Sequence, residues 1–306
     1  MTGPILVPLD GAETSTRALP TALALARATG APLELVRVFD VPFGSLTGRA
    51  GPLGVADAAA ELRARARHEM DGIAERLRAD GVPTTVAVLD GTDVARVLLA
   101  HAEAGDAAMV VMTTVARGAL GRAFVGSVAD AVMRGAGRPV VLVPPLGQAA
   151  PPPVADARGV ARWRVLVPLD GSPAALGAAE YLLSAYEALP VEVVLFRAVV
   201  PTTLLGIVPA EAMIDTVALD GEEAAAREIL DAVATRFTAR GIPARVEATL
   251  TSSPGSAIVD AARAAGAHLI AMSTRGQGGL TRLAVGSVAD AVVRASPVPV
   301  LLLAPQ

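Results

Sequence analysis

The chain contains no cysteine, and it also contains no lysine, so all 26 of its basic residues are arginine. The absence of cysteine excludes disulfides, thiol catalysis and thiolate metal sites. The absence of lysine excludes Schiff-base catalysis, a covalent anchor for pyridoxal phosphate and a P-loop lysine. Several classes of enzyme are therefore excluded before any motif is considered.

Aromatic residues make up 3% of the chain and apolar residues 53%, so the core must be built from Val, Leu, Ile and Ala. The net charge of −4 lacks the basic surplus typical of nucleic-acid binding, so we expect no nucleic-acid partner. No uninterrupted apolar run reaches about 18 residues, and the N-terminus lacks a signal-peptide pattern. We therefore predict no membrane partner and a cytoplasmic location.

The sequence contains two copies of one repeated unit. Three matches share one offset of 160 residues: VGSVADAV at 125–132 and 285–292, LVPLDG at 6–11 and 166–171, and GVP at 81–83 against GIP at 241–243. A constant offset from start to end indicates a duplicated domain and not a short solenoid repeat. We predict domains at 1–146 and 162–306, joined by a linker at 147–161 whose three consecutive prolines favour extended chain.

Each copy alternates short apolar runs, which predict buried strands, with helical patterns. The expected strands are 5–9, 33–39, 84–89, 108–113 and 140–143, then 165–169, 191–198, 244–249, 269–273 and 300–303. In the first copy the expected helices are 14–29, 56–79, 93–104 and 127–134, with a loop at 41–55. Strands separated by helices imply right-handed crossovers and a parallel sheet covered on both faces. We predict an α/β fold of two doubly wound five-stranded parallel sheets, each in the Rossmann-like order 3-2-1-4-5.

Ligands of such sheets bind beyond the carboxyl ends of the strands, where the strand order reverses, so the loops after strands one and four form the candidate site. After strand one the two copies carry Asp10-Gly11-Ala12 and Asp170-Gly171-Ser172. One interpretation is a turn, because Asp-Gly ends many strands and Asp or Ser caps helices. The other is a carboxylate that accepts hydrogen bonds from a ligand. The sequence alone leaves both open.

After strand four, the second copy clusters Gly276, Gly278 and Gly279 ahead of Gly286-Ser287, which opens a helix. Free amides in a glycine-rich loop and the positive end of a helix together bind anions. Arg275 and Arg282 add charge that suits a phosphate. A serine cap on an ordinary helix would explain Ser287 but neither the glycines nor the arginines.

The spacing of this loop resembles the nucleotide loop G-x2-G-x9-G-[ST] of the universal stress protein family. The second copy fits it from Ser273 through Gly276 to Gly286-Ser287, with serine in place of the first glycine. The first copy runs from Thr113 through Ala116 to Gly126-Ser127 in the same frame. Both copies resemble the family nearly end to end, in its tandem two-domain form.

The resemblance implies that ATP is held in one or both copies, and that Mg²⁺ could arrive with its phosphates. The aspartate after strand one and the residue ending strand two would hold adenine and ribose, the methionine ending strand four would line the base, and the helix start would hold the phosphates. The implied residues of the second copy are Pro168, Asp170, Ser172, Ala198, Met272, Ser273, Arg275, Gly276, Gly278, Gly286, Ser287 and Val288. Those of the first copy are Pro8, Asp10, Val38, Met112, Thr113, Ala116, Gly118, Gly126, Ser127 and Val128.

We expect the second copy to be the better nucleotide site, because the first copy has Ala116 where the second has Gly276, and the alanine methyl group intrudes on the phosphate path. The function that the resemblance implies is a regulatory stress-response protein whose shape or partner depends on nucleotide occupancy. No general base can be named, so we expect at most slow ATP hydrolysis. Two alternatives stay open: a weak ATPase, and an interaction or scaffold protein with degenerate sites, which Ala116, Thr113 and Ser273 favour.

The resemblance also implies that the last strands pair the two domains into a pseudo-dimer, and that two tandem chains form a homodimer. The sequence identifies no protein partner. The three histidines, His68, His101 and His268, lack the spacing of metal ligands, so we predict no metal site built by the protein.

Overall fold

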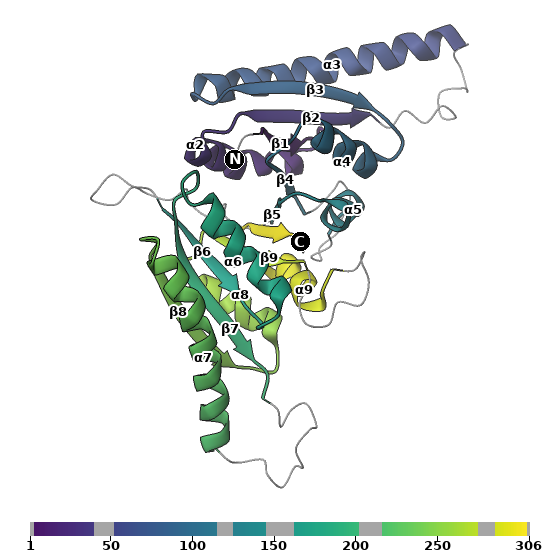
Figure 1. Cartoon of the computed structure of the whole chain (residues 1–306). Helices are drawn as coiled ribbons and strands as arrows, with labels where there is room; N and C mark the ends of the chain where they lie inside the picture. Colours follow the sequence, from purple (N-terminus) through teal and green to yellow (C-terminus); the bar gives the residue numbers. More distant parts are fainter. Residues whose placement is uncertain are drawn as a thin grey trace. The chain divides into compact units, whose positions relative to one another are not determined.

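A computed structural model describes residues 3–39, 52–114, 125–144, 162–201, 216–274 and 285–304. The chain divides into two compact units, Met1–Pro145 and Leu146–Gln306. In each unit helices pack against a sheet of strands (Figure 1). Within the described residues, no helix combines the length and the apolar character that a membrane crossing requires.

The described residues of the first unit form strands connected by helices. Its elements are β1 (Ile5–Pro8), α1 (Glu13–Thr16), α2 (Ala18–Thr29), β2 (Leu33–Phe39), α3 (Pro52–Ala79), β3 (Thr84–Asp90), α4 (Val94–Ala104), β4 (Met109–Thr113), α5 (Ser127–Gly135) and β5 (Val140–Val143). The strands are parallel and lie in the order β3-β2-β1-β4-β5. This arrangement confirms the predicted order 3-2-1-4-5.

The second unit has the same architecture. Its elements are β6 (Trp163–Pro168), α6 (Pro173–Ala185), β7 (Val191–Val199), α7 (Thr216–Thr238), β8 (Ala244–Leu250), α8 (Pro254–Ala264), β9 (Leu269–Ser273), α9 (Ser287–Ala295) and β10 (Val300–Leu303). The strands are again parallel, in the order β8-β7-β6-β9-β10. The duplication seen in the sequence is therefore a duplication of topology.

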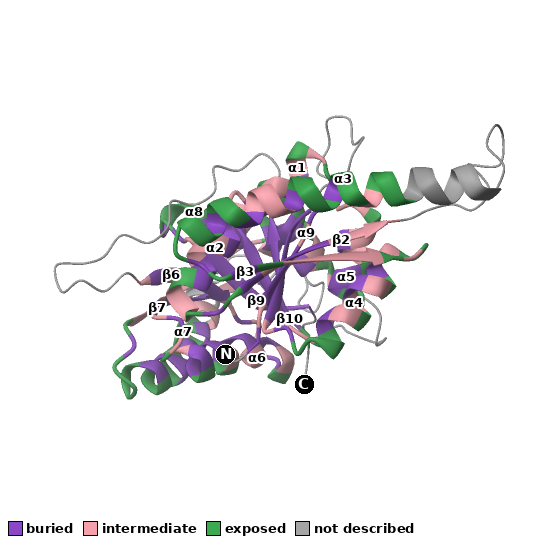
Figure 2. Ribbon diagram, turned by 90° about the horizontal axis from the view of Figure 1, so that it is seen from above, coloured by how far each residue is buried: buried purple, intermediate pink, exposed green. Residues whose placement is uncertain are grey.

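The core of each unit is its sheet. Every residue of β4, β5, β9 and β10 is buried, as expected where helices cover both faces of parallel strands. In Figure 2 the inner strands such as β9 are buried, β2 and β3 are largely intermediate, and the outward side of α3 is exposed. Successive residues of β2 point to opposite faces, so Arg37 reaches Glu69 of α3 while Val36 and Val38 face the other way, toward α4.

Most predicted boundaries agree with the structure to within one or two residues, and the two larger differences both depend on proline. The single helix expected at 14–29 is broken at Arg17 into α1 and α2. Pro20 has no amide to bond the carbonyl four residues earlier, and a helix that begins at Ala18 places it in the first turn, where no such bond is needed. The loop expected at 41–55 ends early because α3 begins at Pro52, a residue suited to the first position of a helix.

Candidate functional site

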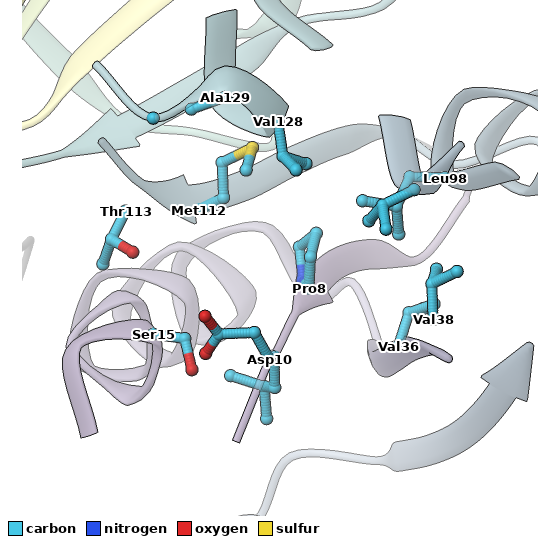
Figure 3. Close-up of a pocket in the computed structure, with 13 residues that line it drawn as sticks. Pro8, Asp10, Ser15, Val36, Val38, Leu98, Met112, Thr113, Val128 and Ala129 are labelled. Atoms are coloured by element: carbon cyan, nitrogen blue, oxygen red, sulfur yellow. The ribbon is translucent and has the colours of Figure 1, made fainter. Parts of the chain in front are cut away.

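A cavity of about 160 Å³ opens in the first unit at the carboxyl ends of β1 and β4 (Figure 3). These two strands are neighbours at the point where the strand order reverses, which is the position where doubly wound sheets bind ligands. The lining residues come from β1 and the turn after it, α1, β2, α4, β4 and the start of α5. They are Pro8, Leu9, Asp10, Ser15, Val36, Val38, Val94, Leu98, Met112, Thr113, Gly126, Val128 and Ala129.

The lining is mostly apolar. Val36 and Val38 come from β2, Leu98 comes from α4, and Met112 brings its thioether from β4 (Figure 3). The polar side chains are those of Asp10, Ser15 and Thr113. The cavity therefore offers an apolar slot together with a small number of polar groups, as small-molecule sites usually do.

Asp10 makes the turn that one interpretation predicts, and its carboxylate is free to lie where the other would need it. Its Oδ1 accepts a hydrogen bond from the Ala12 amide at 2.8 Å, which makes a tight turn after β1. The next residue, Gly11, has φ +81°, and a Cβ there would lie 2.4 Å from Nη2 of Arg37. Only glycine fits this turn without strain. The turn leaves the exposed carboxylate of Asp10 at the mouth of the cavity.

The start of α5 closes another side of the cavity. Gly126 is the N-cap, with extended backbone and no side-chain cap. Its amide donates a hydrogen bond to the Thr114 carbonyl at 2.6 Å, which ties the helix start to the end of β4. Gly126, Val128 and Ala129 line the cavity, whereas Ser127 is exposed and is not part of the lining. The first amides of a helix have no partner within the helix and attract anions.

The second unit repeats this backbone. Oδ1 of Asp170 accepts a hydrogen bond from the Ser172 amide at 2.9 Å. Gly286 caps α9 in the same conformation as Gly126 caps α5, and its amide donates to the Thr274 carbonyl at 2.8 Å. Met272 lies in β9, and Ala198 lies in β7. Pro168 ends β6, while Ser287 and Val288 begin α9.

Two hydroxyl groups predicted to contact ligand in the second unit make hydrogen bonds within the fold. Oγ of Ser172 accepts a hydrogen bond from the Ala175 amide at 3.1 Å and so caps α6. Oγ of Ser273 is buried and donates to the Leu303 carbonyl at 3.4 Å. These contacts stabilise the ends of α6 and β9, and they give both serines a structural role.

The family model described as the universal stress protein family matches residues 1–144 and, a second time, residues 162–304. The chain belongs to the universal stress protein family.

Known universal stress proteins match the chain in sequence and in fold. A universal stress protein of Mycobacterium tuberculosis is 29% identical over 198 residues, which cover 64% of this chain and 62% of that protein. The chain thus spans less than two thirds of that relative's length. The crystal structure of an Archaeoglobus fulgidus universal stress protein matches 99% of this chain and 96% of that one, with a TM-score of 0.65 and 22% identity. A solved universal stress protein in complex with cAMP matches 47% of this chain and 97% of that one, with a TM-score of 0.35 and 22% identity.

The structure adds six residues to the site that the family resemblance did not name: Leu9, Ser15, Val36, Val94, Leu98 and Ala129. Val36 could have been found, because it lies two residues before Val38 on a strand and therefore shares its face. Val94 and Leu98 could not, because only the packing of α4 brings them to the cavity. Five residues predicted from the family loop lie outside the described residues: Ala116, Gly118, Arg275, Gly276 and Gly278.

Proposed function

We propose that this universal stress protein binds an adenine nucleotide and acts in a stress response through a change of shape or partner that depends on occupancy. The observation that supports this proposal is the cavity of the first unit, which combines an apolar slot, a carboxylate and a helix start. The family resemblance supports the finer proposals that the nucleotide is ATP, and that the chain works in the cytoplasm as a homodimer without a nucleic-acid partner.

The size of the cavity supports a role for it in binding the base. At about 160 Å³ it is smaller than the roughly 300–1,000 Å³ typical of pockets that enclose a whole small molecule. We infer that it takes the flat, largely apolar adenine ring between Pro8, Val38 and Met112. The ribose and the phosphates would then lie at the mouth of the cavity.

The polar groups at the mouth suit the remainder of a nucleotide. The Asp10 carboxylate can accept hydrogen bonds from ribose hydroxyls, and the first amides of α5 can donate to phosphate oxygens. Among the described residues, no three His, Cys, Asp or Glu side chains gather into a set that could hold a metal ion. Mg²⁺ would therefore depend on oxygen ligands from the phosphates themselves.

The lining favours binding over rapid turnover. Asp10 is the one ionisable side chain among the lining residues that the structure describes. If Asp10 binds the ribose, it is not placed to activate a water molecule at the γ-phosphate. This supports a regulatory protein with slow ATP hydrolysis at most, which a timed assay of ADP formation would measure.

The Asp10→Asn variant tests the proposed site. We expect about tenfold weaker ATP binding, or roughly 1.4 kcal/mol, in isothermal titration calorimetry, because the amide removes the charge that favours donors on the ribose. Asparagine keeps an oxygen that can accept the Ala12 amide, so the turn survives. The exposed Glu75→Gln on α3 makes the same chemical change away from the cavity and should leave affinity unchanged.

Mass spectrometry of ligand released from the purified protein gives a second, independent measurement, and we expect it to identify an adenine nucleotide. If no nucleotide is released and titration to millimolar ATP gives no heat, the proposal is wrong. The interaction or scaffold alternative would then be the better account.

A further inference from the structure

The two units share one backbone frame around the site, so residues 160 apart occupy equivalent places. The Leu9 amide donates to the Val36 carbonyl at 2.8 Å, and the Leu169 amide donates to the Phe196 carbonyl at 2.8 Å. Pro8 pairs with Val36 in the first sheet, and Pro168 pairs with Phe196 in the second. With the register conserved, a difference between the two sites must come from their side chains.

The largest of these differences is phenylalanine in place of valine. Val36 lines the cavity of the first unit, and Phe196 lies at the equivalent position with only 2% of its surface exposed. Because equivalent positions on a strand point to the same face, the Phe196 ring lies on the face of the second sheet that corresponds to the cavity side of the first. A ring is much larger than an isopropyl group, and protein interiors are close-packed, so a buried ring here takes up space that a base would need.

The helices beside this position lie close together in the second unit. A Cβ at Gly255 of α8 would lie 2.8 Å from Cβ of Ala291 in α9, closer than real side chains pack. The first-unit counterpart of Gly255 is Ala95, which has its methyl group buried in α4. In the first unit, α4 and α5 form walls of the cavity through Leu98 and Val128. In the second unit, glycine at 255 lets the two corresponding helices pack closely.

A third difference removes a polar group. Ser15 lines the first-unit cavity with its hydroxyl, whose Oγ donates to the Ala12 carbonyl at 2.7 Å. The counterpart is Ala175, which has no hydroxyl and is buried in α6. The second unit therefore lacks one of the three polar side chains that the first unit places around its cavity.

We infer that only the first unit accepts an adenine base, and that the Phe196 ring and the close packing of α8 on α9 close the equivalent place in the second unit. This inference rests on the proposed function and assigns it to one half of the chain. It reverses the expectation from the phosphate loop that the second copy binds better. That expectation depends on Gly276 and Ala116, which lie outside the described residues.

The stoichiometry of ATP binding to the full-length chain tests the inference, measured by equilibrium dialysis. We expect one ATP per chain. Phe196→Val should open the second unit and raise the value toward two. The matched control is Phe237→Val, which removes the same ring from a fully buried position on α7 of the same unit and should leave one ATP per chain.

The reciprocal variant, Val36→Phe, should fill the first-unit cavity and weaken ATP binding at least about tenfold, with thermal unfolding as the check on folding. A second measurement uses the unchanged chain, so its result does not depend on whether this variant folds. Photo-crosslinking with an azido-adenine ATP analogue, followed by peptide mapping, should label residues of 1–145 alone.

The possible outcomes separate the two proposals. Two ATP per chain, or label in both units, would overturn the inference and leave the proposed function standing. A Phe196→Val chain that still binds one ATP would show that the ring does not close the second unit, which also overturns it. Absence of ATP binding to the unchanged chain would overturn the proposed function as well.

Discussion

His268 lies just before β9, and its environment disfavours a positive charge. Its Nδ1 accepts a hydrogen bond from the Arg164 amide at 2.9 Å, and its ring meets the Trp163 indole edge-on, with centroids 6.3 Å apart. Burial lowers the pKa of His268, and the Arg164 guanidinium lowers it further against a smaller opposing effect of Glu192. The protein therefore holds this ring neutral, with an acceptor nitrogen that protonation would remove.

Acidification should destabilise the protein through this residue. The unfolded chain takes up a proton on His268 near pH 6.5 and the folded chain only at lower pH, so stability falls as the pH drops below about 6.5. The loss is complete once the pH lies below the folded-state pKa. Urea unfolding at several pH values between about 8 and 5 measures this slope. His268→Asn should flatten it, because the Asn side-chain oxygen can accept the Arg164 amide without titrating.

The control is His68→Gln, since His68 is exposed on α3. Its pH slope should match that of the unchanged protein. A His268→Asn chain that kept the original slope would contradict the assignment of this acid sensitivity to His268.

At the scale of helices, the close contact between α8 and α9 predicts that a glycine-to-alanine substitution there has the opposite effect on stability from the same substitution in α6. Gly255→Ala should destabilise the protein by about 1–3 kcal/mol, because the new methyl group collides with Ala291. Gly177→Ala, in α6 of the same unit, should stabilise by about 0.5–1 kcal/mol, because a Cβ there meets no atom within 4 Å. Thermal or urea unfolding measures both. Equal effects of the two variants would show that α8 and α9 are not packed this closely.

The elements themselves were largely predictable from the sequence. Strands such as β2, β5 and β9 match their predicted bounds because a buried parallel strand is a short apolar run with clear ends. The break at Arg17 was missed because it depends on one proline inside an otherwise regular helical pattern. The contrast between Val36 and Phe196 was also in the sequence, but it gains meaning only once a cavity is seen beside one of them.

At the scale of the whole molecule, each unit has its own buried sheet and its own helices. We predict that residues 1–146 and 162–306, expressed separately, each unfold as one cooperative transition, because a domain with its own core can fold alone. Circular dichroism during heating or urea titration measures this. If either half gave no cooperative transition, the predicted domain boundaries at 146 and 162 would need revision.

The hydrogen bond from the Gly126 amide to the Thr114 carbonyl is the first of two backbone hydrogen bonds that connect the start of α5 to β5. The Thr114 amide in turn donates to the Val143 carbonyl, at 3.1 Å, at the end of β5. The helix start that faces the cavity is thus coupled, through two peptide groups, to the last strand in the order of the first sheet. We expect a ligand that shifts the start of α5 to shift β5 as well, through these two hydrogen bonds. Filling the cavity would then change the position of a strand at the edge of the unit.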